Sequence, residues 1–457
     1  MSGSRRTWRA LAGISTIAVA GCAGGGRPET PPATPIVLPA TTVAVAPSAT
    51  PPVAPKDDHA TAAIIADALR EASKIRELPA TSPVRGVALS RAEMAAHVEA
   101  TIEREVPAEA VADEGEVLVA LGVAPPGFDY MRATVSMMSA ELAGYYEPSE
   151  KTMYLAADLG RAERGATLSH ELVHALQDQH YDLGKLLEYH ADASDQQSAV
   201  HALAEGDATS AMLDEMLAPK GAKATDLSDE LIGVQVRAAA QFTAHAGDIP
   251  DILRRSMIAP YVDGILFVHW LRRRGGWAAV DDAWKNLPVS TEQLLHPDKY
   301  LAREAPIVVP VPVVPPGTWE VPKYSDVMGE QSVRLLLEEW LPRIPAASAA
   351  SGWGGDRIVV FRSGARVAVG WHLRYDDAAV AARLAAALLR GVAAQPGTQR
   401  ASLHCVERPS VGPLLVAHRD RDVAVVAGPY DRADGVGKSA GTCQQAAAWA
   451  GSVLAQH

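Results

Sequence analysis

The chain has 457 residues, 48% of them hydrophobic and 21% charged, and a formal net charge of -12 at pH 7. Such a composition is typical of a globular protein, and the length allows two domains once an N-terminal segment is set aside. Nucleic acid is excluded as a partner, because the negative charge and the lack of a basic patch would repel a phosphate backbone.

The N-terminus has the features of a bacterial lipoprotein signal. Three arginines precede a short apolar stretch, and residues 19–22, Val-Ala-Gly-Cys, have the order of a lipobox. About a dozen apolar residues are too few to remain in a bilayer as a spanning helix. We therefore predict removal of the signal peptide, residues 1–21, and lipidation of Cys22, which would anchor the exported protein to a membrane of the cell envelope or to the cell surface. The choice between general and twin-arginine export stays open.

Residues 22–58 are rich in Pro, Ala and Thr and cannot build a core, so we expect an extended tether. Residues 59–305 are assigned to a first folded domain. Its beginning, residues 59–110, has the apolar periodicity of helices, which fits either an integral part of this domain or an inhibitory region. Farther on, residues 144–155 predict two short strands around a Pro-Ser-Glu-Lys turn.

The most informative stretch is His-Glu-Leu-Val-His at residues 170–174, within a run that no Gly or Pro interrupts. Four residues along a helix return to the same face, so His170 and His174 can bind one metal ion. Zinc held in this way lowers the pKa of its bound water, and the adjacent carboxylate of Glu171 can accept the proton. The sequence therefore predicts one Zn²⁺ and a general base, against the alternative that the pattern arose by chance.

Two residues compete for the third position on the metal. Glu205 lies in a second helical run, from about residue 192 to 217, and a glutamate on a second helix can complete a His₂Glu site. His180 stands where the metzincin signature has its last histidine, but an unbroken helix turns it about 240° away from His174. We predict Glu205 as the ligand; cobalt or manganese would also fit this ligand set.

The segments His-Glu-Leu-Val-His-Ala-Leu-Gln-Asp-Gln, residues 170–179, and Ala-Glu-Gly-Asp-Ala, residues 204–208, resemble the gluzincin class of metallopeptidases, in particular exported bacterial members. The resemblance runs from near Glu116 to near Tyr300. It implies a zincin-like domain, helical with a small mixed sheet, in which Glu171 is the base and Glu205 a ligand. In zincins the strand before the zinc helix is an edge that pairs with an extended substrate.

The resemblance also bears on the residues around the metal. Thermolysin-like enzymes have an aspartate four residues after the ligand glutamate, where this chain has Thr209. Candidates for orienting a zinc-bound imidazole are therefore Asp207, Thr209 and Asp178.

A zincin also needs a donor for the oxyanion that forms during hydrolysis. The candidates lie downstream of both helices. His296 is favoured, with Tyr261 and Tyr300 as alternatives.

The last third predicts a separate, smaller α+β domain. Residues 306–317 are rich in proline and are expected to be a stiff linker before residues 318–457. Within the latter, two strand pairs are each followed by a helix, and Asp376 is the expected cap of the first helix. The fold class is thus α+β throughout, ending in a two-layer domain of two ββα units with both helices on one face of an antiparallel sheet. Cys405 and Cys443 could form a disulfide in an oxidising compartment.

These features predict an exported, lipid-anchored zinc metallopeptidase acting on a peptide or protein at the cell envelope. A first alternative is a surface lipoprotein that binds zinc and a protein partner without catalysis. A second is a hydrolase of cell-wall amide bonds.

Overall fold

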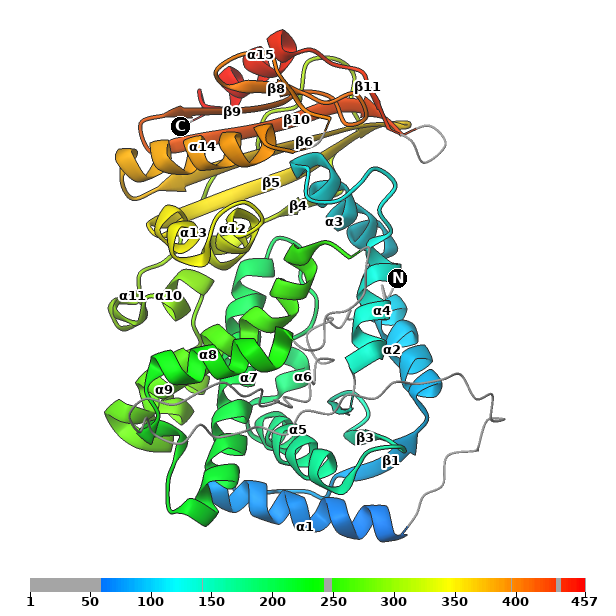
Figure 1. The fold of residues 1–457 in the computed structure, drawn as a ribbon, viewed down its shortest axis with the longest axis vertical. Coiled ribbons are helices and arrows are strands. Elements are labelled where there is room, and N and C mark those ends of the chain that lie inside the picture. The colour runs from blue at the N-terminus through cyan, green and yellow to red at the C-terminus, as the bar shows by residue number, and fades with distance from the viewer. Residues whose placement is uncertain (1–58, 142, 242–248, 396, 433–436, 457) are drawn as a thin grey trace, which may run out of the picture.

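The computed structural model describes residues 59–141, 143–241, 249–395, 397–432 and 437–456, which form a mixed α and β structure (Figure 1). The predicted signal peptide, Cys22 and the tether lie outside these residues. None of the described helices is long and apolar enough to cross a membrane.

The chain begins with four helices and a small mixed sheet. The elements are α1 (His59–Arg76), β1 (Arg85–Leu89), α2 (Arg91–Glu105), α3 (Ala108–Leu121), α4 (Tyr130–Glu141), β2 (Gly144–Glu147) and β3 (Thr152–Ala156). Strands β2 and β3 form the predicted hairpin, and the strand order is β1-β3-β2. Because β1 pairs in parallel with β3, the strand directly before the next helix is central. The expectation that this strand is an edge is wrong; the edge of the hairpin is β2.

A helical layer follows. Its elements are α5 (Arg161–Tyr181), α6 (Leu183–Leu186), α7 (Ser194–Leu217), two short 3₁₀ turns (Ala218–Lys220 and Ala224–Asp226), α8 (Asp229–Gln241), α9 (Asp251–Lys285), α10 (Thr291–Leu295) and α11 (Pro297–Ala302). Helix α1 packs against α5, and its buried Arg76 forms ion pairs with Asp207 of α7 and Asp281 of α9. Helix α1 is therefore an integral part of the helical layer.

Helices α7 and α9 cross where a glycine of one meets a glycine of the other. A Cβ atom on Gly206 would lie 2.2 Å from the carbonyl carbon of Gly264, and a Cβ on Gly264 would lie 1.9 Å from the carbonyl oxygen of Ala202. Only glycine permits this backbone approach. Gly206 weakens α7 as a helix former, but it allows α9 to pass directly beside Glu205.

The proline-rich segment, residues 306–317, packs against the sheet region and is not a free linker. Its buried side chains are three residues apart, at Val309, Pro312 and Pro315. Between them Val308, Val311 and Val314 are 89, 52 and 50% exposed. A period of three is that of a polyproline II helix, whose unpaired backbone needs other partners. Trp449 Nε1 supplies one, donating to the Val313 carbonyl at 2.7 Å.

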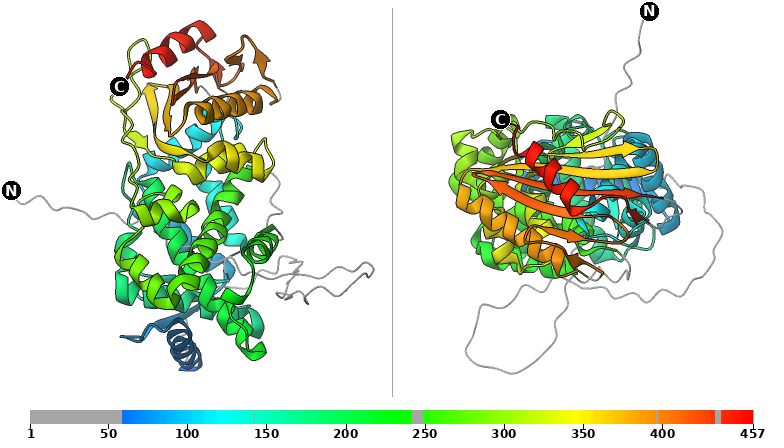
Figure 2. Two further views of the ribbon diagram at one scale, coloured as in Figure 1. Left: turned by 90° about the vertical axis from the view of Figure 1, so that its left-hand side faces the viewer. Right: turned by 90° about the horizontal axis from the view of Figure 1, so that it is seen from above.

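The last third is built around an eight-stranded sheet at the opposite end of the molecule from α1 (Figure 2). Its elements are β4 (Tyr324–Asp326), α12 (Gly329–Leu337), α13 (Arg343–Ala350), β5 (Trp353–Ser363), β6 (Arg366–Tyr375), α14 (Ala378–Ala393), β7 (Gln399–Arg400), β8 (Cys405–Glu407), β9 (Leu414–Arg419), β10 (Asp422–Asp431), β11 (Lys438–Ser439) and α15 (Cys443–Val453). The order is β4-β5-β6-β10-β9-β8-β7, with β11 beside β10, and all pairs are antiparallel.

The two predicted strand pairs and their helices are present, but the helices lie on opposite faces. Helix α14 covers the face that carries Val423 and Val425, whereas α15 covers the face that carries Ala424 and Val426 (Figure 1). The prediction of one covered face is wrong because β10 is apolar at successive positions, so both of its faces must be removed from water. The cap of α14 is also one residue later than predicted: Asp377, not Asp376, accepts from the backbone of α14.

The expected boundary between two domains is bridged by a shared apolar core. Val117 and Leu121 of α3 and Leu253 of α9 belong to the same buried cluster as the strands of the large sheet. Helix α3 thus connects the helical layer to that sheet. At the far side of the sheet, Cys405 and Cys443 are joined by a disulfide with Cα atoms 5.9 Å apart, which ties β8 to α15.

Candidate metal centre

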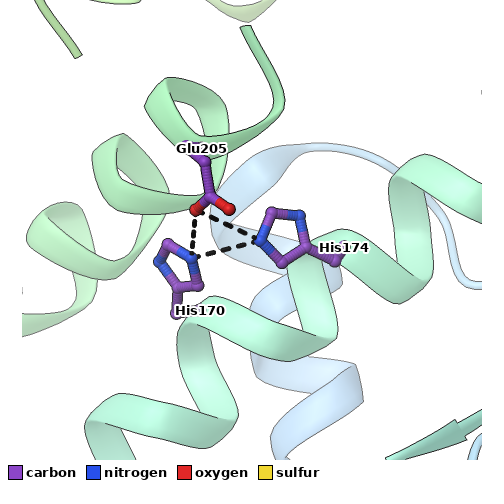
Figure 3. Close-up of side chains that lie close together, drawn as sticks. All are labelled: His170, His174 and Glu205. Carbon is purple, nitrogen blue, oxygen red and sulfur yellow. Dashed lines mark hydrogen bonds and ion pairs between the residues drawn. The ribbon is translucent and has the colours of Figure 1, made fainter. Parts of the chain in front are cut away.

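Three nitrogen and oxygen donors converge between α5 and α7 (Figure 3). The Nε2 atoms of His170 and His174 are 3.1 Å apart. Oε2 of Glu205 lies 3.0 Å from the first and 3.5 Å from the second. The two histidines share one face of α5 because they are four residues apart, and Glu205 reaches them from the neighbouring helix. The structure brings together the three residues predicted as ligands.

The donor set fits zinc in type and in spacing. Ligands at 2.0–2.1 Å from a tetrahedral zinc are about 3.3 Å from each other. The three separations of 3.0, 3.1 and 3.5 Å bracket this value. Two imidazoles and a carboxylate also leave a fourth position for water, as in catalytic zinc sites.

Gln177 determines which nitrogen of His174 is available. Its Nε2 donates to the Ala204 carbonyl at 3.0 Å, so its Oε1, 2.8 Å from Nδ1 of His174, must be the acceptor. In the neutral imidazole, Nδ1 of His174 therefore carries the proton, and Nε2 has the lone pair that a metal requires. The same amide also ties α5 to α7 at Ala204, beside Glu205.

The three side chains of the centre are buried, and their charges influence one another strongly. Burial lowers the pKa of His174, but the carboxylate of Glu205 outweighs it and raises this pKa to about 9. Conversely, burial raises the pKa of Glu205, but His170, His174 and His201 lower it well below its usual value. A buried anion held among imidazoles is a suitable place for a divalent cation.

His201 is an unpredicted neighbour of the centre. Its Nε2 lies 3.0 Å from Oε1 of Glu205, the oxygen that faces away from the other two histidines. A donor there fixes the rotation of the carboxylate, because both oxygens then have partners. The sequence could have predicted this contact, because His201 precedes Glu205 by four residues and the two therefore share one face of α7.

Glu171 is held beside the centre by the hairpin. Its Oε2 accepts from the backbone N–H of Tyr146 at 2.8 Å, and its side chain is buried. Tyr146 belongs to β2, the edge strand. The predicted base is thus positioned between the α5 histidines and the edge of the small sheet.

Of the three predicted oxyanion donors, Tyr261 lies at the centre. Its ring is 5.8 Å from the His170 ring, at an interplanar angle of 28°. His296 instead bonds Glu330 of α12, with 2.9 Å between Nε2 and Oε1. Tyr300 donates to the Asn286 carbonyl at 2.9 Å. The sequence analysis favoured His296 because spacing along the chain does not show which residue of α9 lies beside His170.

The residues predicted to orient an imidazole have other partners. Asp207 accepts from Arg76 and Trp284. Asp178 accepts from Tyr146, Lys151 and Gly184, and the Thr209 hydroxyl has no hydrogen-bond partner in the described part of the chain. Gln177 performs the orienting role. His180, the rejected ligand, is exposed and lies 2.6 Å from the Pro79 carbonyl.

Comparison with known proteins adds one finding. Residues 320–436 match a family described as a domain of unknown function (DUF8575). The match covers strands β4 to β10 of the large sheet and well under half of the chain, and it includes none of the residues at the centre. No curated protein and no solved structure matches the chain.

Proposed function

We propose that the protein is a zinc metallopeptidase of gluzincin type, with His170, His174 and Glu205 holding one Zn²⁺. The observation that carries the proposal is the convergence of these three donors within 3.5 Å of one another, with Glu171 buried beside them. Zinc bound there would act as a Lewis acid and would lower the pKa of a bound water.

The side chains around the centre have distinct roles in this proposal. Glu171 accepts a proton from the attacking water and later delivers it to the leaving amine. Its bond to the N–H of Tyr146 holds the carboxylate in place. Tyr261, stacked beside His170, is the residue assigned to stabilise the oxyanion. Gln177 keeps His174 in the tautomer that can bind metal.

The cell envelope is the proposed location, with attachment through lipidated Cys22. The disulfide between Cys405 and Cys443 supports it, because such bonds persist in oxidising compartments outside the cytosol. The substrate would then be a peptide or protein at the envelope.

The test compares wild type with Glu171→Gln. The amide cannot accept a proton, so peptide hydrolysis should fall by about 10²–10⁴ while one zinc per chain is retained. Zinc is measured by elemental analysis and hydrolysis with quenched fluorescent peptides. A wild type that binds zinc but hydrolyses no peptide would favour the binding lipoprotein; release of fragments from purified cell wall alone would favour the amide hydrolase. A wild type without zinc would refute the metal centre.

A further inference from the structure

A cavity of about 310 Å³ adjoins the metal centre. It is an open pocket lined mainly by residues of α3, α4, α7 and the start of α9. His201, which contacts Glu205, is part of its wall. The cavity size is at the lower end of the range for small-ligand pockets.

Two helices place this cavity next to the proposed reaction site. On α7, the wall residues Gln197 and His201 precede Glu205 by two turns and one turn. On α9, Met257 precedes Tyr261 by one turn. One turn is about 5.4 Å, so both walls lead within one turn to residues at the metal centre. The cavity is therefore about one helical turn from the centre, a distance that a long side chain of a bound peptide can span.

The lining combines apolar side chains and uncharged polar side chains with a single carboxylate. Val106, Val111, Met138 and Met257 supply apolar surface. Glu114 is the one acidic residue among the described lining residues, and they include no lysine or arginine. Tyr324 donates to Oε1 of Glu114 at 2.6 Å, and Tyr130 also lines the cavity. Apolar surface together with one carboxylate suits a long side chain that has a cationic end.

The surroundings of Glu114 are negative. Burial raises the pKa of Glu114 to about 7, and the nearby carboxylates of Asp326 and Asp113 contribute to the increase. The Tyr324 hydroxyl opposes this rise only in part. A cation in the cavity would favour the ionised form of Glu114 and lower this pKa.

We infer that this cavity binds a lysine or arginine side chain of the peptide, with Glu114 pairing with its charged end. The inference rests on the proposed peptidase function and names its substrate class: basic peptides. The aliphatic part of the side chain packs against the valines and methionines. The ring of Tyr130 is a further favourable neighbour for the cation.

A binding experiment tests the inference without turnover. Zinc-loaded, full-length mature protein carrying Glu171→Gln is titrated by calorimetry with alanine-rich peptides, acetylated and amidated at their ends. The peptides come in pairs that differ only in having lysine or norleucine at one position, and this position moves along the peptide from pair to pair. At one position the lysine peptide should bind about tenfold tighter, the effect of one charged hydrogen bond. Adding Glu114→Gln should abolish this difference.

Glu109→Gln is the matched control, because Glu109 lies on the same helix but pairs with exposed Lys323 outside the cavity. It should keep the lysine preference. Equal binding of lysine and norleucine peptides at every position, or a preference that survives Glu114→Gln, overturns the inference.

Hydrolysis separates failure of the inference from failure of the proposed function. A wild type that cleaves neutral and basic peptides equally well keeps the peptidase and loses the basic pocket. Lysine-selective binding that depends on Glu114, without hydrolysis by the wild type, keeps the pocket and refutes the peptidase. Absence of both binding and hydrolysis refutes both.

Discussion

Buried polar groups are arranged differently in the helical layer and in the large sheet. Around α5 and α7, the donor atoms of buried His170, His174 and Glu205 converge on one point, and Glu171 is buried next to His170. In the sheet region, buried Asp356 accepts from Met328 N, Gly329 N and two tryptophan rings, and so holds a loop in place. Convergence of several titratable groups on one point, rather than burial alone, distinguishes a candidate site from a structural polar contact.

The largest effect is expected at the third ligand. Glu205→Ala removes the carboxylate and leaves two imidazoles, so zinc content should fall from one per chain to almost none. Glu215→Ala, on the same helix outside the centre, should retain the metal. Elemental analysis after dialysis measures both. Equal zinc content in the two variants would show that Glu205 is not a ligand, and the helical layer would then differ from the sheet region in no functional respect.

A smaller effect is expected from the residue that orients His174. Gln177→Leu removes the acceptor for Nδ1 and should weaken zinc binding by about 10–100-fold. Gln177→Glu retains the acceptor for Nδ1 but loses the donor to the Ala204 carbonyl, so its zinc affinity should lie between those of the leucine variant and wild type. Competition with a chelating dye gives the dissociation constants. If the leucine variant binds zinc as tightly as wild type, the amide has no orienting role.

The smallest effect is expected from glycine-to-alanine changes at one closely packed position in the helical layer and one in the sheet region. A Cβ on Gly206 meets the α9 backbone at 2.2 Å, and one on Gly391 meets the Trp340 ring at 2.1 Å. Alanine at either position should lower the free energy of unfolding by about 1–3 kcal/mol. Only Gly206→Ala should also weaken zinc binding, because it displaces the helix that carries Glu205.

Gly165→Ala is the control for that pair. A Cβ on Gly165 meets nothing within 4 Å, and alanine favours the helix, so stability should be unchanged or slightly higher. Denaturant titration and zinc content are measured on all three variants. Unchanged zinc affinity in Gly206→Ala would show that the centre does not depend on the α7–α9 crossing.

Local patterns predicted much of the helical layer. The unbroken apolar run around residues 170–174 gave α5, and the spacing of its histidines gave their common face. The second run gave α7 and Glu205. Gln177 and His201 were missed because their importance depends on which faces of α5 and α7 meet. His296 was preferred to Tyr261 for the same reason.

The sheet region shows where local patterns lose information. Strand pairs and helices were predicted there, but α14 and α15 were expected on one face. Residues 423–427 are apolar without alternation, so the sequence does not indicate which face each helix covers. The proline-rich segment was expected to be a linker, although its buried period of three holds it against the sheet region.

By itself, the sequence determined the α5 and α7 helices, the residue types of a candidate zinc site and the pairing partners Cys405 and Cys443. These follow from spacing within one helix or from the small number of candidate residues. Tertiary structure alone decided that Gln177 and His201 contact the candidate ligands His174 and Glu205, that Tyr261 is the tyrosine beside His170 and that Glu114 lies in the adjoining cavity. Those contacts join helices distant in sequence, and their geometry depends on helix crossings such as that of Gly206 with Gly264, which no local pattern records.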